Sequence, residues 1–237
     1  PLVAGTYPGA DAVVTVSEGV AEDLAAHTGL PRDRITTVYN PVFSPRLLEL
    51  AREPVSHPWY EPDAPPLVLA VGRLEPQKDF ALLLRAFARV RQVRPVRLLI
   101  LGEGRERSKL TQLAEALGVR DAVDLPGFVP NPYAHMARAN LFVLSSRYEG
   151  LPTVVIEALA CGCPVVSTDC PSGPVEILER GRYGRLVPVG DAPALARAMR
   201  AALDERADRA RLQRRAAEFS VERAAPRYLE LMGADAA

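Results

Sequence analysis

The sequence is poor in cysteine, and the few that it has lie close together. Its three cysteines are Cys161, Cys163 and Cys170. An odd number of clustered cysteines does not form a disulfide framework. The spacing of Cys161 and Cys163 is too tight for the usual zinc pairs, and no histidine nearby completes a site. We therefore expect small buried thiols in a reducing compartment, and no metal site.

Net charge and long apolar runs are also lacking. Lys+Arg and Asp+Glu number 29 each, which disfavours nucleic-acid binding because such proteins usually carry a basic excess. No stretch reaches the ~18 consecutive apolar residues of a membrane span, and no signal peptide is visible. With 48% hydrophobic and 24% charged residues, we expect a globular protein with a substantial core.

Short apolar runs and segments with helical spacing alternate from residue 66 onward. Runs typical of strands lie at 67–71, 97–101, 123–125, 141–144, 164–168 and 185–187. Helical patterns lie at 80–93, 105–117, 153–160, 175–179, 192–203, 206–218 and 221–231. This alternation predicts an α/β fold with a parallel sheet covered by helices on both faces.

The first 66 residues follow a different pattern. A strand at 12–16, a helix capped by Ser17 and a strand at 35–38 precede a proline-rich segment that carries a short helix at 45–52. We expect residues 1–43 to be the truncated end of one domain, 44–66 a linker and 67–220 a second domain. Residues 221–237 form a C-terminal helix and tail. The first residue is proline and a dense motif region follows at once, so we expect the chain to begin inside a longer protein.

Two cations follow the first strand of the second domain. Gly72 allows a tight turn, and Arg73 and Lys78 then lie on a loop that enters a helix. Arginine offers a planar fork of donors and lysine a point charge, which together suit a diphosphate. For this loop alone, two solvated surface cations are the alternative.

Two acids follow the strand at 141–144. Glu149 lies on a loop and Glu157 in the second turn of the next helix, with Gly150 and Pro152 keeping that helix from starting earlier. The free amides of a helix N-terminus between the acids form a ready anion site. Each carboxylate can accept hydrogen bonds from vicinal hydroxyls. A single solvated acid is the alternative for either glutamate, but the pair with its intervening residues favours a binding site.

These segments resemble the family 4 retaining glycosyltransferases. Glu149 and Glu157 match the E-x7-E signature of that family, and Val71-Gly72-Arg73-Leu74-x3-Lys78 matches its phosphate loop. Further matches are Asp124-Leu125-x-Gly127-Phe128-Val129, Ala160-Cys161-Gly162-x-Pro164-Val165-Val166, Ser172-Gly173-Pro174-x-Glu176-Ile177, Asp11-Ala12-x-Val14-x2-Ser17-x2-Val20 and Val38-Tyr39-Asn40-Pro41-Val42. The resemblance implies that residues 67–220 form a Rossmann-like, nucleotide-sugar-binding domain, one half of a GT-B fold.

The resemblance also implies a role for each matched residue. Arg73 and Lys78 neutralise the diphosphate after Gly72, Glu157 holds the ribose, and Val129 contacts the base through its main chain. Glu149 holds the donor sugar together with the backbone of Gly150 and Leu151. Pro152 and Thr153 start the helix whose amides face the phosphates. Among these residues, the resemblance implies catalytic roles for Glu149, Arg73 and Lys78.

The implied activity is transfer of a hexose or N-acetylhexosamine from a nucleotide sugar, with UDP favoured, to a glycan or lipid-linked acceptor with retention of configuration. The family needs no metal or other cofactor. It implies a bacterial enzyme of polysaccharide biosynthesis in the cytoplasm, with peripheral attachment to the inner face of the membrane through the absent part of the first domain as an open alternative. We expect the chain alone not to turn over. A non-catalytic nucleotide-sugar-binding module and a GT-B epimerase are the alternatives, whereas a glycosidase would leave Arg73 and Lys78 without a task.

Some polar residues give weaker signals. Glu103 lies in a glycine-containing turn that lacks the third glycine of a dinucleotide fingerprint, and contact with the donor is one possible role for it. The histidines His27, His57 and His135 lie outside the motifs, so we expect surface or core roles for them. We expect the arginine-rich helix at 206–218 to present a solvated face, with a membrane-surface role as the alternative.

Overall fold

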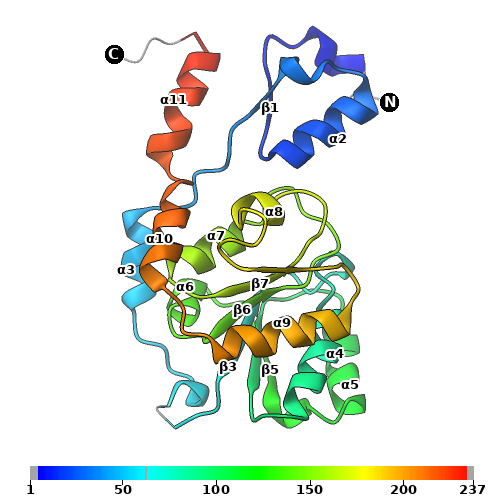
Figure 1. The fold of residues 1–237 in the computed structure, drawn as a ribbon, viewed down its shortest axis with the longest axis vertical. Coiled ribbons are helices and arrows are strands. Elements are labelled where there is room, and N and C mark those ends of the chain that lie inside the picture. Colours follow the sequence, from blue (N-terminus) through cyan, green and yellow to red (C-terminus); the bar gives the residue numbers. More distant parts are fainter. Residues whose placement is uncertain (1–4, 62, 234–237) are drawn as a thin grey trace.

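The computed structural model describes residues 5–61 and 63–233, which form two lobes (Figure 1). We call residues 5–40 the small lobe and residues 44–219 the large lobe. Residues 1–4 of the expected first domain, residue 62 of the expected linker and residues 234–237 of the expected tail lie outside the described residues.

The small lobe consists of two parallel strands and a helix. Strand β1 (Val13–Thr15) pairs with β2 (Ile35–Thr37), and helix α2 (Glu18–Thr28) connects them. The side chain of Ser17 caps α2 by accepting a hydrogen bond from the Val20 amide at 3.3 Å, as the sequence predicted. The 3-10 turn η1 (Tyr7–Gly9) precedes β1, and the 3-10 turn η2 (Arg32–Arg34) lies between α2 and β2.

The large lobe is built on six parallel strands in the order β5-β4-β3-β6-β7-β8. They are β3 (Leu67–Val71), β4 (Arg97–Leu101), β5 (Val123–Gly127), β6 (Leu141–Leu144), β7 (Val165–Thr168) and β8 (Arg185–Val187). The chain starts in the middle at β3, winds outward to β5, and then returns to β6 beside β3. The order therefore reverses between β3 and β6, which makes this pair the switch point where doubly wound sheets bind ligands.

Helices cover both faces of this sheet. Helices α4 (Phe80–Arg91), α5 (Arg107–Ala116) and α9 (Ala192–Asp204) pack on one face with Val68 and Ala70. Helices α3 (Pro45–Arg52), α6 (Pro132–Met136), α7 (Thr153–Ala160) and α10 (Arg209–Ala217) pack on the other with Leu67 and Leu69. Alternate residues of β3 thus enter opposite cores, and the predicted α/β class is confirmed.

Most of the expected elements are present, with ends that differ by a few residues. Helix α6 was not expected from the sequence. In the structure, Asn131 caps the helix by accepting from the Ala134 amide at 3.3 Å, and its buried residues join the core. Helix α10 begins three residues later than expected because Asp208 caps it at the Arg211 amide. The remaining short elements are η3 (Pro58–Tyr60), η4 (Pro76–Lys78), η5 (Arg120–Ala122) and α8 (Pro174–Ile177).

The prediction that the arginine-rich helix presents a solvated face is wrong for part of α10. Arg215 is only 9% exposed, and its guanidinium donates to the Ile177 carbonyl at 2.9 Å and the Glu176 carbonyl at 2.7 Å. Arg209 and Arg211 also donate to main-chain carbonyls of the large lobe. These carbonyls lie far from the helix in sequence, so composition alone did not reveal them.

Two segments run from the large lobe towards the small lobe and lie side by side. We call these segments, residues 41–43 and 219–220, the two passages. The amides of Val42 and Phe43 both donate to the Phe219 carbonyl, at 2.8 and 2.9 Å. Helix α11 (Val221–Leu231) then leaves the large lobe and runs up towards the level of the small lobe (Figure 1). No helix in the described ranges is both long and apolar enough to cross a membrane.

Candidate active site

The candidate site lies at the carboxyl edge of the sheet, at the switch point. Strand β3 leads into the turn that carries Arg73 and Lys78, and β6 leads into the loop that carries Glu149. These two strands are neighbours, with Val68 opposite Leu141. The fold therefore brings two motifs that are about 70 residues apart in sequence to one edge of the sheet.

The turn after β3 is fixed by its backbone. The Gly72 amide donates to the Leu101 carbonyl at 3.0 Å, and the Leu74 amide donates to the Glu103 carbonyl at 2.8 Å. Leu74, which lies between Arg73 and Lys78, is completely buried and fixes the turn to the core. Among the described residues no side chain pairs with Arg73, which is exposed.

Lys78 and Glu149 form an ion pair that is largely shielded from solvent. The distance from Lys78 Nζ to Glu149 Oε1 is 2.6 Å, and the side chains are 15% and 8% exposed. Ser146 Oγ donates to the same carboxylate oxygen at 2.6 Å, and Gln77 Nε2 lies 3.5 Å from the other. Sequence reasoning missed Ser146 and Gln77 as partners of Glu149. Their closeness in sequence to Glu149 and Lys78 is the signal that was available.

A cavity of about 500 Å³ opens beside this pair. Its lining includes Gly72 and Arg73 from the turn after β3, Val129 from the segment after β5, and Glu157 from α7. The lining is mostly apolar where Phe128, 75% exposed, and Tyr133 contribute. An apolar, partly aromatic lining that also contains one cation, Arg73, and two acids, Glu103 and Glu157, suits a nucleoside phosphate.

Glu157 is one of the two acids in the lining of this cavity, and its environment is unusual. Its side chain has no hydrogen-bond or ion-pair partner within the described ranges. Burial among apolar residues raises the pKa of Glu157 to about 7, because the charged form loses hydration. A cleft acid with a raised pKa is a typical feature of a ligand site.

The loop between the two acids ends at the N-terminus of α7. Pro152 precedes the first helical residue, Thr153, and gives no side-chain cap, so the first amides of the helix are available to an anion. The Gly150 carbonyl accepts a hydrogen bond from Ser17 of the small lobe at 2.8 Å. Leu151 is 8% exposed and packs in the core below the loop.

The structure therefore separates the predicted residues into three groups. Gly72, Arg73, Val129 and Glu157 border the cavity, whereas Lys78 and Glu149 form an ion pair outside its lining. The remaining predicted residues, Gly150, Leu151, Pro152 and Thr153, form the loop and helix start between the two acids.

The residues with weaker signals lie at the border of the site or away from it. Glu103 is at the cavity rim, with its carboxylate 2.6 Å from Arg107. His57 bonds Asp124, His135 bonds Tyr60, and His27 bonds the Asp23 carbonyl. The histidines thus have the surface and core roles that the sequence predicted. Across residues 5–61 and 63–233, no group of three or more metal-ligating side chains is placed to hold a metal ion.

The fold defines the class of protein first. The chain superposes on the lipopolysaccharide outer core galactosyltransferase WaaB with a TM-score of 0.78 and 24% identity, covering 94% of this chain and 62% of that one. It also superposes on Anabaena HepE, solved with UDP and glucose, with a TM-score of 0.78 and 23% identity, over 94% of this chain and 63% of that one. The α/β architecture is therefore half of a GT-B fold.

The sequence then identifies the family. Residues 52–219 match the model for glycosyl transferases group 1, and residues 1–44 match that for glycosyltransferase family 4. This chain belongs to the group 1 glycosyl transferases, as the motifs indicated. A relative is the N-acetylgalactosamine-N,N'-diacetylbacillosaminyl-diphospho-undecaprenol 4-alpha-N-acetylgalactosaminyltransferase of Campylobacter jejuni, 33% identical over 86% of this chain. The chain spans 54% of that relative's length.

Proposed function

We propose that this chain is the donor-binding part of a retaining glycosyltransferase that moves a hexose or N-acetylhexosamine from a nucleotide sugar to a glycan or lipid-linked acceptor. One observation carries the proposal. At the switch point, a cavity of about 500 Å³ is bordered by the cation Arg73 and the acid Glu157, neither of which has a side-chain partner within the described ranges. A cation and an acid without side-chain partners in the lining of one cavity match a ligand with a phosphate and free hydroxyls.

The residues divide the donor between them. We assign Arg73 to the diphosphate and Glu157 to the ribose, whose hydroxyls can donate to its carboxylate, because both residues line the cavity. Val129 and Phe128 line the side that the base would occupy. Glu149, held by Lys78 and Ser146, lies next to the start of α7, where a sugar attached to the diphosphate would lie.

The chemistry follows from these positions. Breaking the bond between sugar and phosphate leaves negative charge on the departing diphosphate. Fixed cations and helix amides aimed at that charge lower the barrier, because they are already oriented when the charge develops. Arg73, Lys78 and the N-terminus of α7 supply this stabilisation from the large lobe. Glu149 fixes the sugar rather than attacking it, since its carboxylate is already engaged by Lys78 and Ser146.

Two similar proteins support this proposal. The Campylobacter jejuni relative is named as a transferase of N-acetylgalactosamine to a diphospho-undecaprenol-linked sugar, and Anabaena HepE is described in complex with UDP and glucose. For this chain we propose a UDP-linked donor and a glycan or lipid-linked acceptor. We also propose that it acts in the cytoplasm and requires no metal.

Calorimetry tests the donor site. UDP, GDP and ADP are titrated into this chain with a chelator present, and at least one of them should bind, UDP most tightly. Arg73→Ala should weaken that binding at least tenfold, as expected for loss of a charged phosphate contact. Arg94→Ala is the matched control, because Arg94 pairs with Asp204 next to the opposite end of β4. Absence of binding at millimolar concentration, or equal loss in both variants, would sink the proposal.

A further inference from the structure

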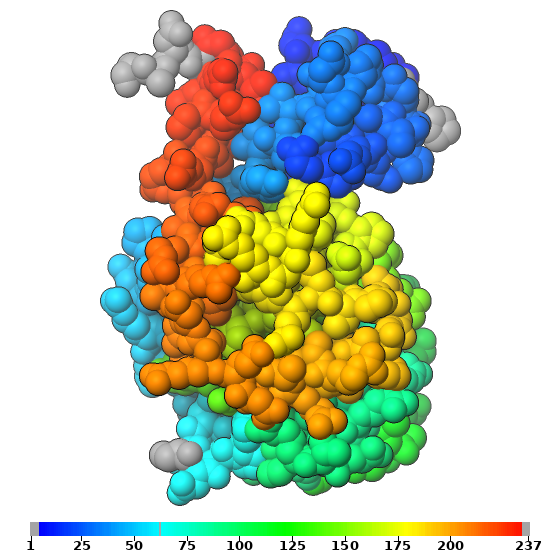
Figure 2. Space-filling model, in the orientation of Figure 1, coloured from blue at the N-terminus to red at the C-terminus, as the bar shows by residue number. Residues whose placement is uncertain are grey.

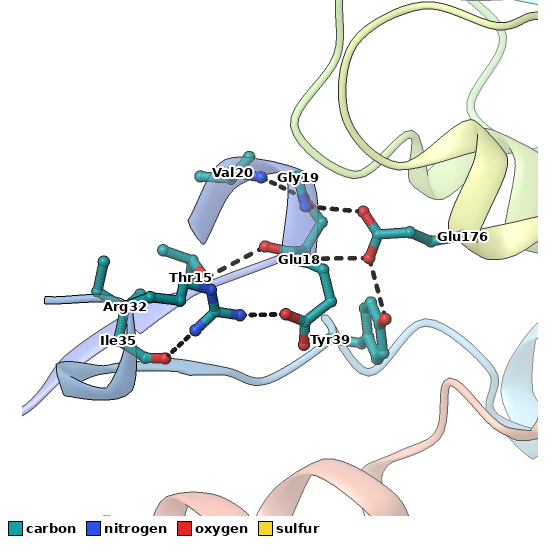
Figure 3. A network of polar contacts seen from close by, with 9 residues as sticks. Thr15, Glu18, Gly19, Val20, Arg32, Ile35, Tyr39 and Glu176 are labelled. Atoms are coloured by element: carbon teal, nitrogen blue, oxygen red, sulfur yellow. Dashed lines mark hydrogen bonds and ion pairs between the residues drawn. The ribbon is translucent and has the colours of Figure 1, made fainter. Parts of the chain in front are cut away.

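One carboxylate of the large lobe reaches across to the small lobe. Glu176 lies in the short helix α8, and both of its oxygens accept from main-chain amides at the start of α2 (Figure 3). Glu176 Oε2 accepts from the Glu18 amide at 2.8 Å, and Oε1 accepts from the Gly19 amide at 3.0 Å. These are the first two amides of α2, which have no acceptor within their own helix. An anion is also favoured there by the helix dipole.

A third donor from the small-lobe side completes this contact. The Tyr39 hydroxyl donates to Glu176 Oε2 at 3.0 Å. Burial, followed by the charge of Glu176, raises the pKa of Tyr39, so the phenol keeps its proton and remains a donor. Three donors thus meet one carboxylate that comes from more than 130 residues away in the chain. In Figure 2 the yellow surface that includes α8 meets the blue surface of the small lobe.

Glu176 is itself anchored to the passages between the lobes. Arg215 donates to the Glu176 carbonyl at 2.7 Å and stacks its guanidinium 4.9 Å from the ring of Phe219. Phe219 lies where the two passages meet, and its ring makes an edge contact with Tyr39 at 5.4 Å. Glu176 is therefore connected through Arg215 and Phe219 to the segments that run between the lobes.

The same contact reaches the loop between Glu149 and Pro152. Ser17, the cap of α2, donates to the Gly150 carbonyl at 2.8 Å. The Glu149 amide donates to the Pro171 carbonyl at 3.1 Å, just upstream of Glu176. A Cβ atom on Gly173 would lie 2.4 Å from Pro152, so the turn that carries Glu176 is pressed against this loop. The α2 contact and the loop of Glu149 are therefore in direct contact with each other.

We propose that Glu176 is a positioning residue that latches the small lobe to the large lobe and thereby holds the loop of Glu149 in place. Its effect on donor sugar rests on the proposed function, whereas its effect on the lobes does not. Replacing Glu176 by glutamine weakens this contact, because the amide lacks the charge that the N-terminus of α2 attracts and has only one acceptor oxygen.

The distance between the lobes tests the latch. Spin labels at Glu22→Cys in the small lobe and Arg85→Cys in the large lobe report it, since both positions are exposed and the native cysteines are buried. Glu176→Gln should shift and broaden the distance distribution towards longer values. Glu205→Gln, which removes an acid paired with Arg185 inside the large lobe, should leave the distribution unchanged. An unchanged distribution in Glu176→Gln would overturn the proposal.

A milder variant keeps the test decisive if Glu176→Gln fails to fold. Tyr39→Phe removes one donor and leaves the carboxylate in place, so it should produce a smaller shift in the same direction. If Tyr39→Phe folds and the distribution is that of the unsubstituted chain, the three-donor latch is wrong.

Binding of UDP and UDP-glucose tests the link to the loop. Glu176→Gln should weaken UDP-glucose about tenfold, the loss expected for a charged hydrogen bond, and leave UDP within twofold, because the nucleotide contacts lie inside the large lobe. Equal weakening of both would overturn the link. If the unsubstituted chain binds neither probe, the proposed function fails and the distance measurement alone decides the latch.

Discussion

The two acids of the candidate site differ sharply in their surroundings. Glu149 accepts hydrogen bonds from Lys78 and Ser146, whereas Glu157 has no partner in the described chain and a pKa raised to about 7. The first arrangement holds a carboxylate in one orientation. The second leaves a carboxylate ready to accept from a ligand, and its charge is restored when hydroxyl donors replace lost water.

The raised pKa of Glu157 predicts a pH dependence of nucleotide binding. Ribose hydroxyls donate best to the ionised carboxylate, which is the minor form at pH 6 and the major form at pH 8. The association constant for UDP should therefore rise about tenfold from pH 6 to pH 8, following ionisation near pH 7. Titration calorimetry at a series of pH values measures this rise.

The control for this profile is Glu157→Gln. Its profile contains only the titration of the phosphates and of the other groups, so the difference between the two proteins isolates Glu157. The variant should bind UDP more weakly at pH 8, with a flatter profile. Parallel profiles would contradict the assignment of Glu157 to the ribose.

The ion pair of Lys78 and Glu149 predicts an effect on stability. Lys78→Met leaves Glu149 shielded without its cation, and should lower the free energy of unfolding by about 3 kcal/mol. The double variant Lys78→Met, Glu149→Gln removes both charges and should recover most of that loss. Chemical denaturation of the three proteins measures the coupling. No recovery in the double variant would show that the pair contributes little to stability.

At the scale of elements, the ends of β3 and β4 shape the turn that carries Arg73. Gly102 adopts a φ of 142°, and a Cβ atom there would lie 2.0 Å from the Gly72 carbonyl oxygen. The two strands therefore approach too closely for any side chain. The turn that carries Arg73 depends on a glycine 29 positions further along the chain.

Gly102→Ala should therefore disturb both stability and binding. The added methyl pushes the Gly72 turn away, which should cost about 3 kcal/mol of stability and weaken UDP binding. Gly118→Ala is the matched control, because Gly118 also has a positive φ, of 68°, but an added Cβ would meet nothing within 4 Å. It should cost only about 1 kcal/mol and leave UDP binding unchanged. Thermal unfolding and calorimetry distinguish the two.

The order of elements was largely readable from the sequence. Strands such as Leu67–Val71 and Leu141–Leu144 are short apolar runs with clear ends, and helix Thr153–Ala160 begins behind Pro152. Such signals are local, so they survive without tertiary information. Helix α6 escaped prediction because its five residues are too few for a periodic pattern, and core burial stabilises it.

For the whole molecule, the buried histidine predicts how stability changes with pH. His135 is 9% exposed, and burial, followed by His57 and Arg138, lowers the pKa of His135 to about 4. The unfolded chain protonates this histidine near 6.5, so it binds more protons than the native state between pH 6.5 and pH 4. The contribution is complete above pH 6.5 and is lost as the pH falls to 4.

The predicted loss from this histidine is about 3 kcal/mol across that window. His135→Gln keeps a polar partner for the Tyr60 hydroxyl but does not titrate. The difference in unfolding free energy between the two proteins should therefore change by about this amount from pH 7 to pH 4. Urea unfolding at each pH measures it. A constant difference would mean that the pKa of His135 is the same in the native and the unfolded chain.

The sequence by itself determined the class of fold and the chemical character of the site. Alternating short strands and helices specify a parallel sheet, and Arg73, Lys78, Glu149 and Glu157 follow strands whose ends meet at one edge. These features are local in the chain or follow from general rules of topology, so the amino-acid sequence alone specifies them.

Only the tertiary structure decided which of these groups pair and which remain open. It joins Lys78 to Glu149 across 71 positions, leaves Arg73 and Glu157 at the cavity, and buries Arg215. It also carries Glu176 to the first turn of α2. Such contacts depend on the packing of segments that are distant in sequence. A buried polar group pairs with the partner that the fold brings near it, and no local sequence pattern specifies that partner.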